Sequence, residues 1–254
     1  VLFNSQAQLD RHRGELSRAG VHLGLRVNPE HSEVEVPIYD PCSPGSRLGV
    51  RRAQLDPVRL HGLAGLHFHT LCELGADALQ RTLQVFEDRF AEFIPGRDYV
   101  NFGGGHHVTR PDYDVDLLIR LVNDFKARHG VQVYLEPGEA VALDAGYLVT
   151  TILDVVRADM DVAVMDASVA AHMPDVIEMP YRPPLAGAAR PGEKPHAFRL
   201  AGPSCLAGDV AGEYAFDHPL RPGDTIAFTD QAHYTMVKTN TFNGVLLPSI
   251  ALFS

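Results

Sequence analysis

The sequence predicts an α/β fold in which part of a (β/α)8 TIM barrel is followed by a β-rich domain. Over the first half of the chain, short apolar strand patterns alternate with helical patterns, and such alternation produces a parallel sheet with right-handed crossovers. Two consecutive strand patterns run directly into chemically useful residues, the glycines at 103–105 and Glu136. Functional groups at the carboxyl ends of successive strands are typical of the active face of a barrel.

The elements of the barrel part can be placed by periodicity. We expect strands at 1–4, 22–27, 66–70, 99–103 and 132–136, and helices near 6–19, 53–64, 75–94 and 114–129. These strands are too few to close a barrel of eight. We therefore expect about three further βα units before Val1, so that the chain is a fragment lacking the N-terminal part of the barrel.

A domain boundary is predicted near residue 145. Residues 1–145 are the barrel portion, and residues 146–254 are a β-sheet domain, because the helical period fades and β-branched runs such as 147–156 begin. The stretch 182–195 is dense in Pro, Gly and Ala and predicts a surface loop. The alternating stretch 232–244 predicts a further strand.

The composition excludes several classes of protein. A net charge of −10 and a pI near 5.7 argue against nucleic acid or a membrane surface as partner, and no apolar run reaches membrane length. Three cysteines without C-x-x-C spacing indicate neither a disulfide framework nor a zinc ribbon. The chain does not open with a signal-peptide pattern, so we expect a cytoplasmic protein.

His67 and His69 lie two residues apart in a predicted strand, so both rings face the same side. By themselves they fit hydrogen-bonded core histidines, a metal pair as in metal-dependent barrel hydrolases, or a ring that stacks on a cofactor. His106 and His107 could complete a metal site. Such a site would leave the Cys and Tyr motifs of the second domain unexplained, and we expect no metal.

Two strand ends and one loop carry the other candidate groups. The bare backbone of Gly103, Gly104 and Gly105 predicts free N–H groups that bind a phosphate, although a tight turn would also explain one or two glycines. Glu136, held by a Pro-Gly turn, could pair with a protonated ring nitrogen or a substrate amine. Cys205 lies in a loop and fits either a proton donor or an inert thiol.

Five motifs appear in the order found in the pyridoxal-phosphate decarboxylases of the alanine-racemase-like fold, the ornithine and diaminopimelate decarboxylase group. They are Phe68-His69, Gly103-Gly104-Gly105, Glu136-Pro137-Gly138, Gly202-Pro203-Ser204-Cys205, and Tyr234-Thr235 with Thr241-Phe242-Asn243-Gly244. Further segments resemble the branch of this group that decarboxylates carboxynorspermidine and carboxyspermidine; they lie at 39–49, 68–73, 105–107, 136–140 and 173–180.

The resemblance implies a homodimer whose active sites are shared between subunits. The reaction would release CO2 from carboxynorspermidine or carboxyspermidine and give norspermidine or spermidine, with pyridoxal 5'-phosphate as cofactor. The resemblance implies that His69 stacks on the cofactor ring and that Glu136 pairs with the pyridine nitrogen. It implies that the phosphate is held by Gly103, Gly104, Gly105 and Tyr234, with Cys72 near it. It also implies that Cys205 reprotonates the product in the neighbouring subunit's site.

Two departures from the ornithine-type motif bear on the substrate. Glu139 stands where that motif has an arginine, and Leu206 stands where it has an acid. We expect a small polycationic amino-acid substrate as partner, and a carboxylate in place of a phosphate-binding cation suits a long polycation better than a short amino acid. We expect Glu139 and Asp175 to bind the distal amines, and Glu178 to contribute less, because strand alternation would turn it away from Asp175.

The lysine that binds pyridoxal phosphate covalently in this family has no counterpart here. The three lysines are Lys126 in a predicted helix, Lys194 in a loop and Lys238 in a predicted strand. We expect the family's lysine upstream of Val1, so that this fragment alone is inactive. Two alternatives stay open: a decarboxylase of another basic amino acid, and a lysine-less relative that binds or regulates a partner without chemistry.

Overall fold

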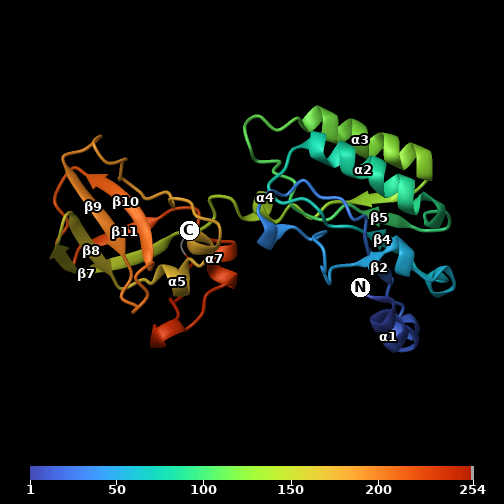
Figure 1. Cartoon of the computed structure of the whole chain (residues 1–254), viewed down its shortest axis with the longest axis horizontal. Helices are drawn as coiled ribbons and strands as arrows, with labels where there is room; N and C mark the ends of the chain where they lie inside the picture. Colours follow the sequence, from blue (N-terminus) through green and yellow to red (C-terminus); the bar gives the residue numbers. More distant parts are fainter. Residues whose placement is uncertain (253–254) are drawn as a thin grey trace. The chain divides into compact units, whose positions relative to one another are not determined.

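The computed structural model describes residues 1–252, which form two compact units (Figure 1). Unit 1 is Val1–Val141, and unit 2 begins at Ala142. Unit 1 holds a parallel sheet with its helices, and unit 2 holds a mostly antiparallel sheet with short helices. The two units carry separate hydrophobic cores, and they are described separately below.

The sheet of unit 1 confirms the five predicted strands, each at a shorter length. Its strands are β1 (Leu2–Phe3), β2 (Gly24–Asn28), β4 (Gly65–His67), β5 (Tyr99–Asn101) and β6 (Gln132–Tyr134), joined in that order and all parallel. A strand that the sequence did not predict, β3 (Val50–Arg51), pairs with the end of β2. Among residues 1–252 no pairing closes this sheet, so what is observed is an open parallel α/β sheet.

Three of the four predicted helices are confirmed: α1 (Gln6–Arg18), α2 (Ala76–Phe90) and α3 (Val115–His129). The α3 helix is capped at its start by Asp114, whose side chain accepts the Leu117 N–H, and at its end by Gly130, which has a φ of 68°. The predicted helix at 53–64 is wrong. Two short 3₁₀ helices, Arg52–Gln54 and Pro57–Leu60, stand there because Pro57 lacks an N–H and favours an extended residue before it.

The register of the sheet separates an apolar face from a polar face. One row of aligned, buried side chains is Leu25, Leu66, Val100 and Val133. The next row is Arg26, His67, Asn101 and Tyr134. Because successive side chains point to opposite sides of a strand, the first row packs in the core with the rings of Phe86 and Phe125 from α2 and α3, and the second row lines the other face. The polar residues therefore gather on the face away from these helices.

Unit 2 is built on a five-stranded sheet with the order β10-β9-β8-β7-β11. Its strands are β7 (Leu148–Arg157), β8 (Asp161–Met165), β9 (His196–Ala201), β10 (Val210–Phe216) and β11 (Thr225–Phe228). Only the β8–β9 pair is parallel. The predicted β-rich character and the loop before β9 are confirmed.

The strand predicted at 232–244 is wrong. The structure has a short helix, α7 (Tyr234–Val237), and a 3₁₀ turn at Phe242–Gly244. The N–H of Lys238 donates to the Tyr234 carbonyl, which is a helical bond. The left-handed φ of Asn243, 58°, is incompatible with an extended strand. Local hydrogen bonds thus override an alternating pattern that had no neighbouring strand to pair with.

The strand alternation expected around Asp175 and Glu178 is also wrong. These residues bound a short helix, α6 (Asp175–Glu178), which follows α5 (Val169–His172). Residues three apart on a helix lie on the same side. The two carboxylates therefore face a common partner rather than opposite sides.

None of the helices found in residues 1–252 combines the length and the apolar character needed to cross a membrane.

Candidate functional site

Three segments meet beyond the carboxyl ends of β4, β5 and β6. Register places His67 beside Asn101 and Asn101 beside Tyr134. Two residues further on, the chain carries His69, Gly103 and Glu136 on the same side. The Glu136 N–H donates to the Gly103 carbonyl at 2.8 Å, so the backbones stay adjacent past the last strand residues.

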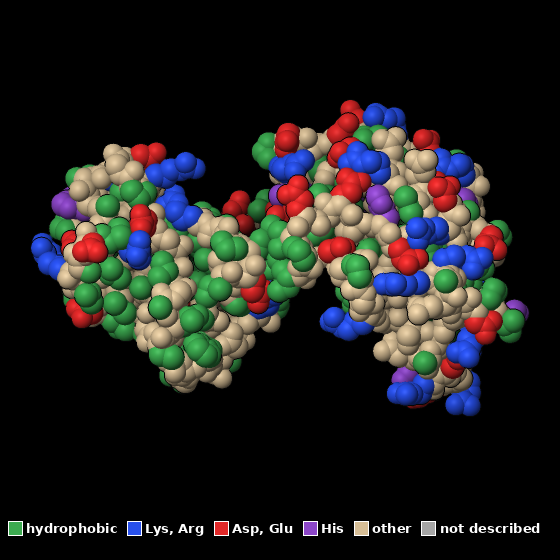
Figure 2. Space-filling view, in the orientation of Figure 1, with side chains coloured by type: hydrophobic (Ala, Val, Ile, Leu, Met, Phe, Trp, Pro, Cys, Tyr) green, Lys and Arg blue, Asp and Glu red, His purple; other side chains and the backbone are tan. Residues whose placement is uncertain are grey.

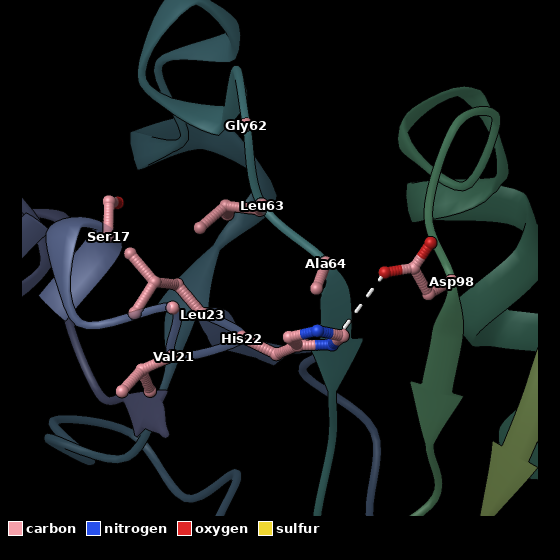
Figure 3. A pocket seen from close by; sticks show the side chains of 9 residues that line it. Ser17, Val21, His22, Leu23, Gly62, Leu63, Ala64 and Asp98 are labelled. Atoms are coloured by element: carbon pink, nitrogen blue, oxygen red, sulfur yellow. Dashed lines mark ion pairs between the residues drawn. The ribbon is translucent and has the colours of Figure 1, made fainter.

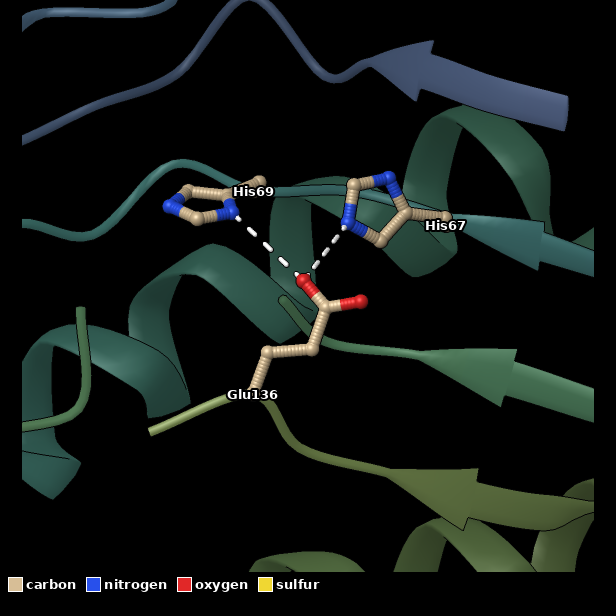
Figure 4. Close-up of side chains that lie close together, drawn as sticks. All are labelled: His67, His69 and Glu136. Carbon is tan, nitrogen blue, oxygen red and sulfur yellow. Dashed lines mark ion pairs between the residues drawn. The ribbon is translucent and has the colours of Figure 1, made fainter. Parts of the chain in front are cut away.

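Glu136 stands between the two histidines of the HxH pattern (Figure 4). Its Oε2 lies 3.5 Å from Nε2 of His67 and 3.8 Å from Nδ1 of His69. Both contacts are longer than a hydrogen bond. One ligand atom from each of the three residues lies within 4.8 Å of the others, so the spacing by itself would also suit a metal ion.

Asn101 joins Glu136 to the glycine run and is not among the site residues predicted from the sequence. Its Nδ2 donates to Oε1 of Glu136, and its Oδ1 accepts the Gly103 N–H, both at 2.8 Å. A backbone N–H can only donate, so the amide oxygen must face Gly103 and the amide nitrogen must face the carboxylate. A polar residue inside the apolar 99–103 strand pattern, two positions before the first glycine, was the signal for it.

The glycines are required by close backbone packing. A side chain on Gly104 would approach the Glu136 carbonyl oxygen to 2.6 Å, and Gly103 has a left-handed φ of 73°. The expected free N–H groups are not found at these two positions. Gly103 donates to Asn101, and Gly104 donates to Nδ1 of His69 at 3.3 Å. The run therefore fixes the His69 ring in addition to any phosphate contact.

Burial keeps the histidines of this region uncharged. Desolvation lowers the pKa of His67 to about 4, against the opposing effect of Glu136. Desolvation also lowers the pKa of His106, beside the glycine run, to about 4, and together with the nearby Arg26 charge it lowers the pKa of His69. A neutral His69 agrees with its Nδ1 accepting a hydrogen bond.

Arg26 brings a half-buried positive charge to the same face and is likewise not among the site residues predicted from the sequence. Its Nη2 donates to the His69 carbonyl at 3.2 Å. Burial lowers the pKa of Arg26, but a guanidinium stays protonated in proteins. An arginine in the apolar strand pattern 22–27 was the available signal.

Glu139 lies in α4 (Gly138–Ala142), next to the Glu136 segment. It accepts the Thr109 hydroxyl at 2.8 Å and lies 3.4 Å from Nε2 of His107. Cys72 is half-buried, and desolvation raises the pKa of its thiol. The structure thus gathers His69, the glycines, Glu136, Glu139 and Cys72 in unit 1.

The remaining predicted residues belong to unit 2. Cys205 is exposed in the loop between β9 and β10. Asp175 and Glu178 both accept from the ammonium of Lys238, at 2.5 Å and 2.6 Å. The same ammonium lies 5.2 Å from the centre of the Tyr234 ring. The cluster of Asp175, Glu178 and Tyr234 is therefore arranged around one alkylammonium group.

A hollow of about 330 Å³ lies at the opposite ends of the strands (Figure 3). It is lined by residues that precede β2, β4 and β5, among them His22, Ala64 and Asp98. His22 and Asp98 lie 3.9 Å apart and are well exposed. No predicted site residue lines this hollow, and in barrel folds this end serves stability.

Comparison with known proteins places the geometry in a family. The family model described as pyridoxal-dependent decarboxylase, C-terminal sheet domain, matches residues 26–232. A carboxynorspermidine/carboxyspermidine decarboxylase from Campylobacter jejuni is 46% identical over 99% of this chain and 68% of its own length. A carboxyaminopropylagmatine decarboxylase from Synechocystis is 45% identical over 98% of this chain and 65% of its own length.

Solved structures agree with this placement. The crystal structure of carboxynorspermidine decarboxylase from Campylobacter jejuni, complexed with norspermidine, matches with a TM-score of 0.83 and 44% identity, over 97% of this chain and 67% of that chain. A viral arginine decarboxylase bound to agmatine, at 22% identity over 96% of this chain and 68% of that one, shares the fold with a TM-score of 0.75. The chain thus spans about two thirds of the length of these relatives.

Proposed function

The chain belongs to the pyridoxal-dependent decarboxylase family, and on that premise we propose that its protein decarboxylates carboxynorspermidine or carboxyspermidine in polyamine biosynthesis. The observation that carries the proposal is the Glu136 carboxylate, held by Asn101 and flanked by the His69 ring. The relatives with these substrates in their names are 46% and 36% identical. The second candidate substrate is carboxyaminopropylagmatine, which carries a distal guanidinium in place of an amine, because the carboxyaminopropylagmatine decarboxylase is 45% identical.

The residues of unit 1 fit pyridoxal phosphate. Oε1 of Glu136 is satisfied by Asn101, whereas Oε2 has only long contacts with two uncharged rings. A carboxylate oxygen in that state suits a protonated pyridine nitrogen. When bound, the pyridinium ring of the cofactor accepts the electron pair left by the departing CO2. His69 would stack on that ring, and the 103–105 glycines, with Tyr234 and Cys72, would hold the phosphate end.

The carboxylates fit a polycationic substrate. Glu139 would bind one distal amine, with Thr109 fixing its Oε1. Asp175 and Glu178 already bind an alkylammonium, that of Lys238. We infer that the far ammonium of the substrate takes its place between these two carboxylates.

Cys205 would supply the last proton. After CO2 leaves, its thiol donates a proton to the α-carbon, and the resulting thiolate regains a proton from water. The proposal includes a homodimer in which Cys205 serves the neighbouring subunit's site. Exposed apolar side chains on β7, namely Val149, Leu153 and Val156, would suit contact with a second copy.

The proposal also includes a complete (β/α)8 barrel and a cytoplasmic location. The parallel sheet of unit 1, with functional groups at its carboxyl ends, is the arrangement a barrel uses. All three cysteines are free thiols, as a reducing compartment requires.

The test uses protein expressed from the complete coding sequence. We expect cofactor absorbance near the visible range, borohydride trapping of the cofactor on a lysine, and CO2 release from carboxynorspermidine or carboxyspermidine. Carboxyaminopropylagmatine, diaminopimelate and ornithine are assayed in parallel, and a higher kcat/KM for any of them reassigns the substrate. A complete protein without cofactor absorbance would instead support the non-catalytic relative.

A further inference from the structure

Asp209 is a buried carboxylate for which the reaction above has no use. Its side chain is among the least exposed polar groups of unit 2, at 2%. Oδ1 accepts the N–H groups of Val169 and Ala170, at 2.6 Å and 3.1 Å. Oδ2 accepts the Ser168 hydroxyl at 2.9 Å and the Ser204 N–H at 3.2 Å. One carboxylate therefore joins the start of α5 to the residue before Cys205.

The same residue closes the loop that carries Cys205. The Gly202 N–H donates to the Asp209 carbonyl at 2.7 Å, and the Asp209 N–H donates to the Leu206 carbonyl at 2.9 Å. A side chain on Gly202 would lie 2.5 Å from Oδ1 of Asp209. Loop 202–209 is thus folded tightly around this carboxylate, and Cys205 is exposed on its outside.

The hydrogen bonds use both oxygens of the carboxylate. Four donors point at its two oxygens, and a carboxylate is the side chain that accepts on both sides. Burial of a carboxyl group without such partners would be costly, so the four hydrogen bonds fix the position of the Asp209 side chain. The side chain in turn orders the loop, whose residues 202–209 form no strand of their own.

We propose that Asp209 is a positioning residue that sets the location of the Cys205 thiol for proton donation. The inference rests on the proposed role of Cys205. A displacement of about 1 Å at a reacting group can cost on the order of 100-fold in rate, so the loop must be held as firmly as the sheet-borne groups of unit 1. Asp209 itself is buried, so it would act through the loop that carries Cys205.

Asp209→Asn tests the bonds made by Oδ2, to the Ser204 N–H and the Ser168 hydroxyl. The amide oxygen can keep the two α5 bonds at Oδ1, while the amide nitrogen replaces Oδ2 and faces the Ser204 N–H, donor against donor. Ser168→Ala is the matched control. It removes the hydroxyl that caps α5 and contacts Asp209, but it leaves the Ser204 bond intact.

The first readout is amide hydrogen exchange in the full-length holoenzyme, which does not depend on activity. We expect exchange in the 202–208 segment to rise about tenfold or more in Asp209→Asn and to stay near wild type in Ser168→Ala. Unchanged exchange in Asp209→Asn, in a protein that melts normally, overturns the assignment.

The second readout is kinetic. We expect Cys205→Ser to lower kcat about 100-fold and Asp209→Asn to lower it about tenfold, with KM within twofold of wild type. The double variant should be no slower than Cys205→Ser, because both changes act through one thiol. Losses that multiply overturn the positioning role. If Cys205→Ser keeps full kcat, the proton-donor role in the proposed function fails, and the exchange result alone decides the loop assignment.

Discussion

The Glu136 region of unit 1 and the Cys205 region of unit 2 position their functional groups by different means. In unit 1, residues some 35 positions apart, such as Asn101 and Glu136, meet because parallel strands hold them in register. In unit 2, Cys205, Asp175 and Tyr234 lie on a loop or in four-residue helices. Their positions depend on side-chain clamps, namely the Asp209 carboxylate and the Lys238 ammonium.

The two units also differ in the charged and apolar side chains on their surfaces. Figure 2 shows charged side chains spread over the visible face of unit 1 around α2 and α3, while the visible face of unit 2 carries more apolar side chains between fewer charges. Unit 1 keeps its uncharged histidines inside, at His67 and His106. A sheet can bury polar groups at fixed positions because its ladder satisfies the backbone, whereas a loop must satisfy its own.

The largest expected difference between the units is their response to acid. The pKa values of His67 and His106 are lowered from 6.5 to about 4 in the folded protein. The unfolded chain therefore binds protons first, so this stability is present above pH 6.5 and is lost as the pH falls toward 4. The loss is about 1.4 kcal/mol per pH unit for each histidine.

Hydrogen exchange of each unit between pH 7 and pH 5 measures this effect. Protection should fall in unit 1 and change far less in unit 2, and His106→Gln should reduce the pH dependence of unit 1 by roughly half. Equal pH dependence in both units would contradict the prediction that unit 1 is the more sensitive to acid.

The next largest effect is expected for Glu136→Gln. The neutral amide cannot stabilise a protonated ring nitrogen, so kcat should fall about 100-fold while thermal stability stays near wild type. The measurement is steady-state CO2 release by the holoenzyme. Glu92→Gln, at an exposed carboxylate paired with Arg52, is the control, and a similar loss there would refute the assignment.

Asn101→Asp tests whether the hydrogen bonds of Asn101 to Glu136 and Gly103 support cofactor binding or catalysis. It sets a carboxylate against Glu136 in place of an N–H donor at 2.8 Å, so we expect about a tenfold loss in cofactor affinity or kcat. Titration of the apoprotein with pyridoxal phosphate measures cofactor affinity and so separates a loss of affinity from a loss of kcat. Asn123→Asp, on the exposed side of α3, supplies the comparison; if it matches Asn101→Asp, added charge alone is responsible.

The smallest effects are expected at the carboxylates proposed to bind the distal amines, which are Asp175 in the ammonium cluster of unit 2 and Glu139 in unit 1. Asp175→Asn should raise KM for carboxynorspermidine about fivefold, and Glu139→Gln should act in the same direction, because each removes one carboxylate from a partly exposed site. Lys238→Met should lower KM, since it removes the ammonium that competes for Asp175 and Glu178. A higher KM in Lys238→Met would show that the lysine supports this site and does not compete for it.

Sequence patterns predicted unit 1 better than unit 2. The strands around Val100 and Val133 belong to an apolar row that must be buried, and the helix between them, α3, has clear caps at both ends. The 232–244 segment alternates equally well, yet it forms α7 and a turn, because no strand among residues 1–252 pairs with it to use its backbone groups. Periodicity reports which side chains are buried together, but pairing decides whether an extended chain is stable.

By itself the sequence determined the alternation of strands and helices, the segments that carry His69, the glycines, Glu136 and Cys205, and the family motifs. Only the tertiary structure decided that Asn101 joins Glu136 to Gly103, that Lys238 occupies the Asp175–Glu178 pair, and that Asp209 clamps the Cys205 loop. These contacts join residues distant in the chain or depend on which oxygen faces which donor. Propensity and spacing are local quantities, whereas hydrogen-bond pairing is settled only when the folded backbone brings the partners within reach.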